Sequence, residues 1–318
     1  MNRRHAIKLI GSTGATAFLP GRLLAEESGG GLGKEFLPPH KFVVGHRGAC
    51  AYAPENTLAS YRLAIKHGVE YVEQDLQITE DGVLVCCHDT VLNRVTNVAE
   101  VFPDRFTERT VKGKAEKQWP LSNFTLKELK QLDFGSHLDA RFKGEKIPTW
   151  QEAIDEIKGK AGLCPETKSP NTYSKLGFDM EEMVMATLKK NGLDTAKANS
   201  STPILIQSFS KEGLKKLAAK SGTKWPLLWL TNVDYKWTPE VFDEASKHFA
   251  VLGPHKSDVN ADFVKQAHSR GMMIVSFTFR SAELKGFATV KDEMHHYLYD
   301  LGVDGMFTDN PDQFPRQK

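Results

Sequence analysis

Ionisable residues follow three short apolar runs in the first third of the sequence. The runs are Phe42–Val44, Val69–Val72 and Val83–Cys87, and each has the length and β-branched content of a buried strand. The residues that follow them are His46, Arg47, Glu73, Asp75 and His88. Imidazoles transfer protons near neutral pH, guanidinium groups bind anions, and paired carboxylates bind hard cations. These residue types at strand ends predict a site that combines acid–base chemistry with a metal ion.

A segment with helical periodicity joins the first two runs. Apolar residues recur at helical spacing between Asn56 and His67, Asn56 or Thr57 can cap the start, and Gly68 can end the helix. A strand–helix–strand unit makes its two strands parallel, so their carboxyl ends lie at the same face. The ionisable residues after both strands should therefore converge there.

Glu73 and Asp75 are separated by one residue. Because strand side chains alternate, both point to one side of the sheet and Gln74 points to the other. Two carboxylates this close repel each other unless a cation lies between them, and a divalent cation with oxygen ligands is the usual solution. Taken alone, such a pair is more often a solvated loop. The nearby histidines and arginine favour a metal site.

The connection to the third run leaves two topologies open. The turn Thr79–Gly82 has the composition of a β-hairpin, which would place His88 at the opposite end of the sheet from Asp75. Alternatively, the chain after Asp75 runs back along the sheet in extended form, and the third run rises parallel to the second. We predict this second topology because it brings His88 to the metal site.

The stretch Leu163–Lys168 repeats the pattern of a short strand followed by charged residues. Glu166 and Lys168 are two apart and share a face of the strand. Glu166 is therefore a candidate third oxygen ligand, and Lys168 is a candidate contact for an anion. A surface salt bridge is the alternative interpretation of this pair.

Helical and strand patterns alternate through the rest of the chain. Helices are predicted at Thr149–Ile157, Asp179–Asn191, Lys211–Ser221, Pro239–His248, Asp258–Ser269 and Val290–Leu301. Further strands are predicted at Ile204–Gln207, Leu227–Leu230, Ala250–Gly253, Met273–Phe277 and Gly305–Phe307. We predict an α/β fold, a closed (β/α)8 barrel over residues 41–315, with one strand candidate too many. An open doubly wound sheet is the alternative, but no Gly-rich phosphate loop follows the first strand.

Residues 92–146 interrupt this alternation. They are polar, contain prolines and offer only a short capped helix at Phe124–Leu129. A loop this long inside a compact domain is usually functional. Because it starts close to His88, we predict a small inserted subdomain that folds over the site.

Residues 1–25 have the features of an export signal. Arg3-Arg4 precedes a weakly apolar region, as in twin-arginine signals, and an amphipathic helix of a cytosolic protein is the alternative. Residues 26–40, rich in Gly and Pro, are a linker. The net charge of +2, without a basic stripe, speaks against nucleic-acid binding. No later segment has the apolar length for stable membrane insertion.

The four cysteines are Cys50, Cys86, Cys87 and Cys164, and their spacing fits no zinc-binding pattern. We interpret them as free thiols. Cys86 and Cys164 are predicted to face inward one layer below the site, and a disulfide between them is the alternative.

Several of the candidate site residues lie in short motifs that occur together in this sequence. They are His46-Arg47-Gly48, Pro54-Glu55-Asn56-Thr57, Glu73-Gln74-Asp75, His88-Asp89, Glu166-Thr167-Lys168, Gln207-Ser208-Phe209 and Asp304-Gly305-Met306-Phe307-Thr308-Asp309. From Phe42 to Asp312 the sequence resembles the glycerophosphodiester phosphodiesterase family, most of all its periplasmic branch. Phe277-Thr278 stands where many members have Trp-Thr, and the periplasmic branch also has a different aromatic residue there.

The resemblance implies a fold and a set of roles. The fold is a TIM barrel of the phosphatidylinositol-phospholipase-like type with a small subdomain inserted after the second histidine. The implied metal ligands are Glu73, Asp75 and Glu166, the acid and base are His46 and His88, and the phosphate contacts are Arg47 and Lys168. The cofactor is one divalent cation: three acids favour Ca²⁺ or Mg²⁺ over zinc, and an exported, periplasmic enzyme meets more free Ca²⁺.

The implied reaction is hydrolysis of a glycerophosphodiester, such as glycerophosphocholine or glycerophosphoethanolamine, to an alcohol and sn-glycerol 3-phosphate. Such a reaction needs charge neutralised on the phosphate, a deprotonated nucleophile and a protonated leaving group. The family also suggests attack by the glycerol 2-hydroxyl, giving a cyclic phosphate that water opens. A related phospholipase acting on lipids and a non-catalytic surface-binding protein on the same scaffold stay open as alternatives. The sequence also leaves open which headgroup is preferred and which of the two histidines is the base. The oligomeric state is open as well, with a homodimer as one option.

Overall fold

The computed structural model describes residues 33–221 and 225–317, so the predicted signal segment at residues 1–25 lies outside the described residues. Within the described residues, eight parallel strands form a barrel that closes through the pairing of β1 with β2. The strands are β1 (Phe42–Gly45), β2 (Tyr71–Ile78), β6 (Gly162–Thr167), β7 (Ile206–Ser208), β8 (Leu227–Leu230), β9 (Val251–Gly253), β10 (Met273–Phe279) and β11 (Gly305–Thr308). The predicted barrel is confirmed.

Side chains alternate between the inside and the outside of this barrel, as strand geometry requires. On β1, Val44 belongs to the cluster that fills the barrel, whereas Val43 packs in the larger cluster outside it. On β2, Tyr71 lies inside and Val72 outside. The next inward-facing residues after these apolar positions are His46, directly after β1, and Glu73 on β2. The apolar pattern of each strand therefore fixes which polar residue enters the barrel mouth.

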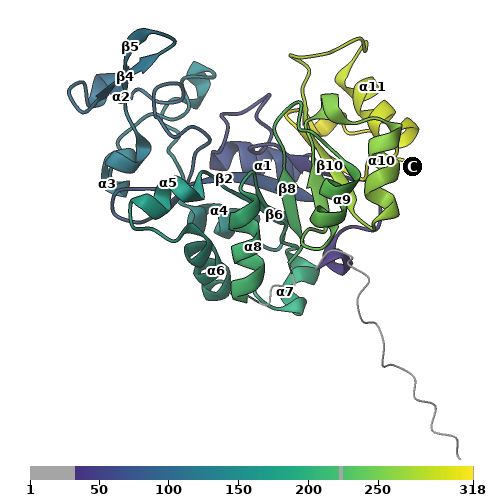
Figure 1. The fold of residues 1–318 in the computed structure, drawn as a ribbon. Coiled ribbons are helices and arrows are strands. Elements are labelled where there is room, and N and C mark those ends of the chain that lie inside the picture. Colours follow the sequence, from purple (N-terminus) through teal and green to yellow (C-terminus); the bar gives the residue numbers. More distant parts are fainter. Residues whose placement is uncertain (1–32, 222–224, 318) are drawn as a thin grey trace, which may run out of the picture.

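Helices surround the strands in Figure 1 and pack on the outer apolar cluster. They are α1 (Leu58–Lys66), α4 (Trp150–Ile157), α5 (Pro170–Lys175), α6 (Met180–Lys190), α7 (Ala196–Ser201), α8 (Lys211–Ser221), α9 (Pro239–Ser246), α10 (Ala261–Ser269) and α11 (Val290–His295). Short turns of other helix types are η1 (Lys34–Phe36), η4 (Lys256–Asp258), η6 (Pro311–Gln313) and the π-helical η5 (His296–Asp300). In the described ranges, no helix combines the length and apolar character that crossing a bilayer requires.

The predicted crossover before the third run is wrong, because β3 (Leu84–Cys86) runs antiparallel to β2 in a hairpin. β2 is longer than its first apolar run, since Leu76 and Ile78 are buried in the outer cluster and carry the strand past Asp75. The hairpin therefore turns beyond the barrel mouth, and β3 comes back toward it. The Cys87 N–H donates to the Asp75 carbonyl at 2.9 Å. His88 thus returns to the level of Asp75, and β3 is the surplus strand candidate.

Residues 92–146 carry short elements of their own. These are α2 (Val98–Val101), β4 (Thr107–Val111), β5 (Lys114–Gln118), η2 (Leu121–Asn123), α3 (Leu126–Leu129) and η3 (Ala140–Phe142). A third apolar cluster, which includes Leu92, Phe124 and Phe134, joins this segment to Val85 and Cys87 near β3. In Figure 1 the β4–β5 hairpin and α2 lie at the upper left, to one side of the barrel.

Each of the four cysteines, all of them in the described ranges, is a free thiol. The prediction that Cys86 and Cys164 face the same interior is wrong for Cys86. Cys164 lies in the cluster inside the barrel, whereas Cys86 lies in the cluster outside it. The antiparallel direction of β3, which is not a barrel strand, accounts for the difference.

Gly48, in the loop after β1, is expected to be sensitive to the addition of a side chain. It has a φ of 90°, and an added Cβ would lie 2.3 Å from the Ser60 Oγ of α1. Gly48→Ala should therefore lower the free energy of unfolding by about 2–5 kcal/mol, combining left-handed strain with overpacking. Gly159→Ala is the matched control, because Gly159 also has a positive φ but no atom within 4 Å of the new Cβ. Urea titration of both variants measures the difference, and equal losses would refute the steric contribution.

Candidate active site

Three buried carboxylates meet at the carboxyl ends of β2 and β6. Glu73 and Asp75 lie on β2, Glu166 lies on β6 beside Asp75, and one oxygen of each falls within 4.8 Å of the others. Burial, followed by the charges of Asp75 and Glu166, raises the pKa of Glu73 well above its ordinary value. Burial likewise raises the pKa of Glu166. The three carboxylates therefore carry more negative charge than the surrounding side chains neutralise.

Two cations partly balance this cluster. Lys168 Nζ lies 3.0 Å from Glu166 Oε1 and 3.4 Å from Asp75 Oδ1, and Arg47 Nε lies 3.3 Å from Asp75 Oδ2. Burial favours a neutral Asp75, but Lys168 and Arg47 overcome it and hold its pKa below the ordinary range. Asp75 Oδ1 is buried and makes no hydrogen bond within the described residues, because its contact with Lys168 is an ion pair at 3.4 Å. Three converging buried carboxylates fit a hard divalent cation.

The loop after β1 places Arg47 between the acids. Arg47 has a φ of 53°, its N–H donates to Glu73 Oε2 at 2.7 Å, and its guanidinium reaches Glu55 at 3.0 Å. Asn56, also at positive φ, donates from Nδ2 to Asp75 Oδ2 at 2.8 Å. Thr57 then caps α1 by accepting the Ser60 N–H. The segment before α1 therefore serves both to start the helix and to hold the acidic cluster.

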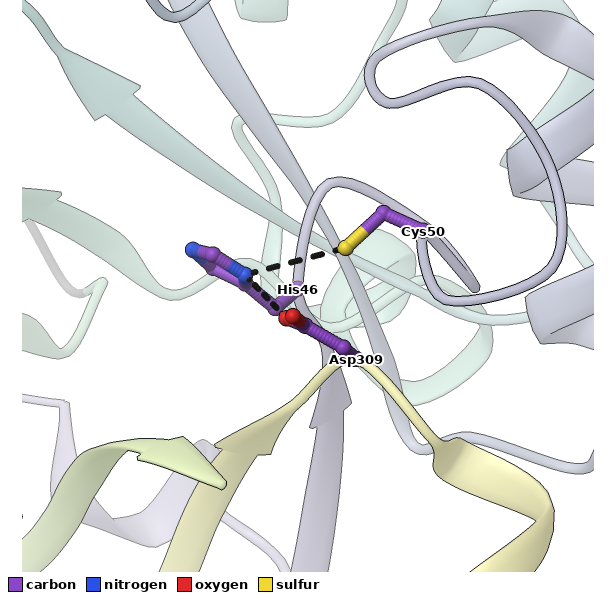
Figure 2. A group of neighbouring side chains, drawn as sticks. All are labelled: His46, Cys50 and Asp309. Carbon is purple, nitrogen blue, oxygen red and sulfur yellow. Dashed lines mark hydrogen bonds and ion pairs between the residues drawn. The ribbon is translucent and has the colours of Figure 1, made fainter. Parts of the chain in front are cut away.

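His46 bridges the acidic cluster and a fourth acid. Its Nδ1 lies 2.6 Å from Asp309 Oδ1 (Figure 2). Its Nε2 lies 3.8 Å from Glu73 Oε2. The Asp309 carboxylate can only accept, so it fixes the tautomer with the proton on Nδ1 and leaves Nε2 as an acceptor. Burial and the charge of Arg47 lower the pKa of His46, although Asp309 opposes them. His46 is therefore held in one orientation, with Nε2 free to accept a hydrogen bond.

His88 has a comparable partner. Its Nδ1 lies 2.7 Å from Asp89 Oδ1, and Arg94 Nε donates to Asp89 Oδ2 at 2.8 Å. Arg94 also donates to both oxygens of Glu55, which in turn accepts from Arg47. This chain of ion pairs runs from His88 to Arg47, the residue that follows His46 in the sequence. Each histidine thus has a carboxylate on Nδ1 and leaves Nε2 for another group.

All seven residues predicted for the site line one cavity of about 210 Å³. They are His46, Arg47, Glu73, Asp75, His88, Glu166 and Lys168. The other residues that line this cavity are aromatic, polar or apolar: Gln207, Phe209, Leu230, His255, Phe277, Thr278, Arg280, Glu283 and Phe307. A second cleft of about 430 Å³ adjoins this cavity and shares His46, Arg47, His88 and Arg280 with it.

No pattern in the sequence indicated a role for the residues that orient the two histidines. Asp89 and Asp309 both appear in the motifs, directly after His88 and after β11, but alternation alone does not show which atom they contact. Arg94 lies in the inserted segment, where no pattern pointed to the site. One general rule could have pointed to such partners: an imidazole that transfers a proton through one ring nitrogen is oriented by a hydrogen bond at the other nitrogen.

Comparison with known proteins agrees with this geometry. The glycerophosphoryl diester phosphodiesterase family matches residues 46–313. The glycerophosphodiester phosphodiesterase of Bacillus subtilis is 31% identical over an alignment of 296 residues that covers 90% of this chain and 89% of that protein. An enzyme of the same name from Haemophilus influenzae is 27% identical, over 86% of this chain and 88% of that protein.

A solved structure provides the third comparison. The phosphodiesterase of Oleispira antarctica, in complex with the product sn-glycerol 3-phosphate, is 27% identical with a TM-score of 0.67, over 88% of this chain and 96% of that one. The family match spans most of the barrel and all seven predicted site residues. The chain therefore belongs to the glycerophosphoryl diester phosphodiesterase family.

Proposed function

We propose that this protein hydrolyses glycerophosphodiesters, with release of an alcohol and sn-glycerol 3-phosphate, in a reaction that depends on a divalent cation. One observation carries the proposal: three buried carboxylates, two cationic side chains and two carboxylate-paired histidines line a single cavity. The relative from Oleispira antarctica, which binds sn-glycerol 3-phosphate, supports the choice of substrate class.

Arg47 and Lys168 are proposed to bind the phosphate. Both side chains are mostly buried, and both lie against Asp75 at the floor of the cavity. The acids around Lys168 outweigh its burial and raise its pKa, so it stays charged. A buried cation attracts a phosphodiester anion more strongly than an exposed one does, because water screens it less.

His46 and His88 are proposed to move the two protons of the reaction. One must accept a proton from the nucleophile, and the other must supply a proton to the leaving alcohol. Both leave Nε2 free of their carboxylate partners, so both can exchange a proton with a bound substrate.

Glu73, Asp75 and Glu166 are proposed to hold the cation, with Ca²⁺ preferred and Mg²⁺ as the alternative. When bound, it would supply positive charge close to the oxygens of the phosphate. The donor set consists of carboxylate oxygens, which hard cations prefer over thiolates or imidazoles. The flexible coordination of Ca²⁺ suits three side chains from two strands better than the strict octahedron of Mg²⁺.

The function is tested by assaying the dialysed protein with glycerophosphocholine, glycerophosphoethanolamine and phosphatidylcholine. Each substrate is offered with excess chelator and again after Ca²⁺ or Mg²⁺ is restored. The proposal expects turnover of the two glycerophosphodiesters that disappears with chelator and returns with cation. Turnover of phosphatidylcholine alone would favour the lipid-directed alternative, and inactivity on all three substrates would favour a binding protein.

Asp309→Asn should lower kcat by at least about a hundredfold, the lower end of the contribution of a positioned acid–base group. Asn can present an N–H to His46 Nδ1 and so favour the tautomer in which Nε2 no longer accepts a proton. KM should change little, because the proposed phosphate contacts stay in place. The control is Asp304→Asn, which alters a carboxylate outside the cavity that lies 2.8 Å from His268 Nε2 and accepts the Ile274 N–H at 2.9 Å. Equal kinetics for the two variants would refute the orienting role of Asp309.

We also propose that the protein is exported in the folded state to the periplasm through its twin-arginine segment. Arg3 and Arg4 lie ahead of a weakly apolar stretch, which supports this route. Changing both to Lys should strand the precursor in the cytoplasm, as measured by cell fractionation. Arg22→Lys, in the same segment, is the control and should be exported normally. Normal export of the double variant would count against the twin-arginine route.

A further inference from the structure

Cys50 lies beside the pair formed by His46 and Asp309, at the edge of the site. Its Sγ is 3.9 Å from His46 Nδ1, and Asp309 Oδ1 is 2.6 Å from the same nitrogen. One ligand atom from each residue lies within 4.8 Å of the others. Figure 2 shows the three side chains converging from the loop after β1 and from the end of β11, with the far edge of the imidazole pointing away from Cys50.

We propose that Cys50, His46 and Asp309 form a zinc-binding site, and that zinc bound there inhibits the enzyme. The inhibitory part rests on the proposed function, whereas the binding part does not. Thiolate, imidazole and a single carboxylate are the ligand types that zinc takes in proteins. The cluster of Glu73, Asp75 and Glu166 offers oxygen alone, so the two sites select different ions.

The spacing suits a tetrahedral ion after a small adjustment. Usual zinc–ligand bond lengths place neighbouring ligand atoms about 3.2–3.6 Å apart in a tetrahedron. The observed 3.9 Å between Cys50 Sγ and His46 Nδ1 is close to this range. The 2.6 Å between Nδ1 and Asp309 must widen, which a rotation of the carboxylate can supply. Water would take the fourth position.

Zinc can reach this site from solvent. All three residues line the cleft of about 430 Å³ beside the catalytic cavity. Cys50 is partly exposed, whereas Cys86, Cys87 and Cys164 are buried.

Burial and the charge of Asp309 raise the pKa of Cys50, so the thiol is protonated in the metal-free protein. Zinc binding therefore releases one proton to solvent, from Cys50 Sγ, while the imidazole of His46 stays neutral and exchanges its Nδ1 proton for one on Nε2.

Inhibition follows from the tautomer of the imidazole. In the metal-free protein Nδ1 donates its proton to Asp309, and Nε2 is free to accept a proton. A neutral imidazole that binds a metal through Nδ1 carries its proton on Nε2 instead. Nε2 then has no lone pair for a proton, and donation from it would leave an imidazolate. The ion also removes Asp309 from its place as the partner of Nδ1. His46 is impaired in either catalytic role.

The binding claim is tested with Co²⁺ as a spectroscopic substitute for Zn²⁺. Metal-free protein titrated with Co²⁺ should develop a near-ultraviolet band from thiolate-to-cobalt charge transfer, and added Zn²⁺ should remove it. Cys50→Ser should lose the band, while Glu73→Gln should keep it because the acidic cluster is a different site. Absence of the band from the wild-type protein, or its survival in Cys50→Ser, would overturn the site.

The inhibition claim is tested by zinc titration of turnover at saturating Ca²⁺. Cys50 is outside the proposed catalytic machinery, so Cys50→Ser should keep the basal activity. It should need at least about tenfold more Zn²⁺ for half-inhibition, since even partners outside the coordination sphere are worth 10–100-fold in metal affinity. Equal sensitivity would overturn the inhibitory role and would place zinc at the acidic cluster. A cobalt band in a protein without diesterase activity would sustain the site and refute the proposed function.

Discussion

Glu73→Gln is expected to abolish tight binding of the divalent cation and turnover together. Glu73 Oε2 accepts the Arg47 N–H at 2.7 Å, and Oε1 accepts from Gln207 at 3.0 Å, so Gln keeps the shape but loses the charge. Second-shell partners alone are worth about 10–100-fold in metal affinity, so losing a direct ligand should cost at least about a hundredfold. Calorimetric titration with Ca²⁺ measures the binding, and a steady-state assay measures the turnover.

Glu181→Gln is a suitable control for this variant. Glu181 is also a buried carboxylate, but it pairs with Lys216 between α6 and α8, away from the cavity. It should bind Ca²⁺ and turn over substrate as the wild-type protein does. Wild-type turnover of Glu73→Gln, or full activity of the dialysed wild-type protein in excess chelator, would rule out the proposed dependence on a cation.

His46→Ala and His88→Ala are each expected to reduce turnover by at least about a hundredfold, and the double variant should be little worse than the poorer single variant. Positioned acid–base groups contribute about 10²–10⁴-fold, and groups that act in one step show losses far below additive. Both histidines line the same cavity, with Asp partners at 2.6 Å and 2.7 Å. Binding of substrate should change less, because Arg47 and Lys168 still hold the phosphate.

If either histidine has a purely structural role, a different result is expected. The variant would then lose thermal stability in step with activity, and its folded fraction would keep near-normal turnover. Turnover per folded molecule, measured together with thermal unfolding, separates the two roles. His268→Ala is the control, because His268 pairs with Asp304 on the surface and should leave turnover unchanged. Independent, multiplicative losses in the double variant would argue against paired action.

Most of the barrel could be predicted because its signals are local. Alternation within each strand separates Val44 and Tyr71, inside the barrel, from Val43 and Val72, outside it. That alternation, continued past the apolar residues, also predicts which polar side chains enter the mouth. The register between Asp75 and Glu166 then brings the predicted acids together.

The direction of β3 could not be predicted from such local signals. Its composition allows both a hairpin and a crossover, and the choice depends on how far β2 continues past Asp75. Leu76 and Ile78 decide this through burial in the outer cluster, which is a tertiary contact. The expectation that a hairpin would carry His88 away from Asp75 was wrong because the hairpin lies beyond the barrel mouth.

The partners of the predicted site residues also depend on tertiary structure. Asp309 meets His46 because β11 pairs with β1, although the two residues are 263 positions apart in the chain. Glu55 meets Arg94 through the position of the inserted segment. Such contacts leave no spacing pattern in the sequence, so they have to be found in the structure.

The most direct test of the account is ³¹P NMR of a glycerophosphocholine digest by the Ca²⁺-loaded protein, with choline measured in parallel. The account predicts that the diester resonance is replaced by that of sn-glycerol 3-phosphate, with one choline released for each, and that Glu73→Gln leaves the diester intact. Phosphocholine and free glycerol as products, or an unchanged diester resonance with the wild-type protein, would contradict it.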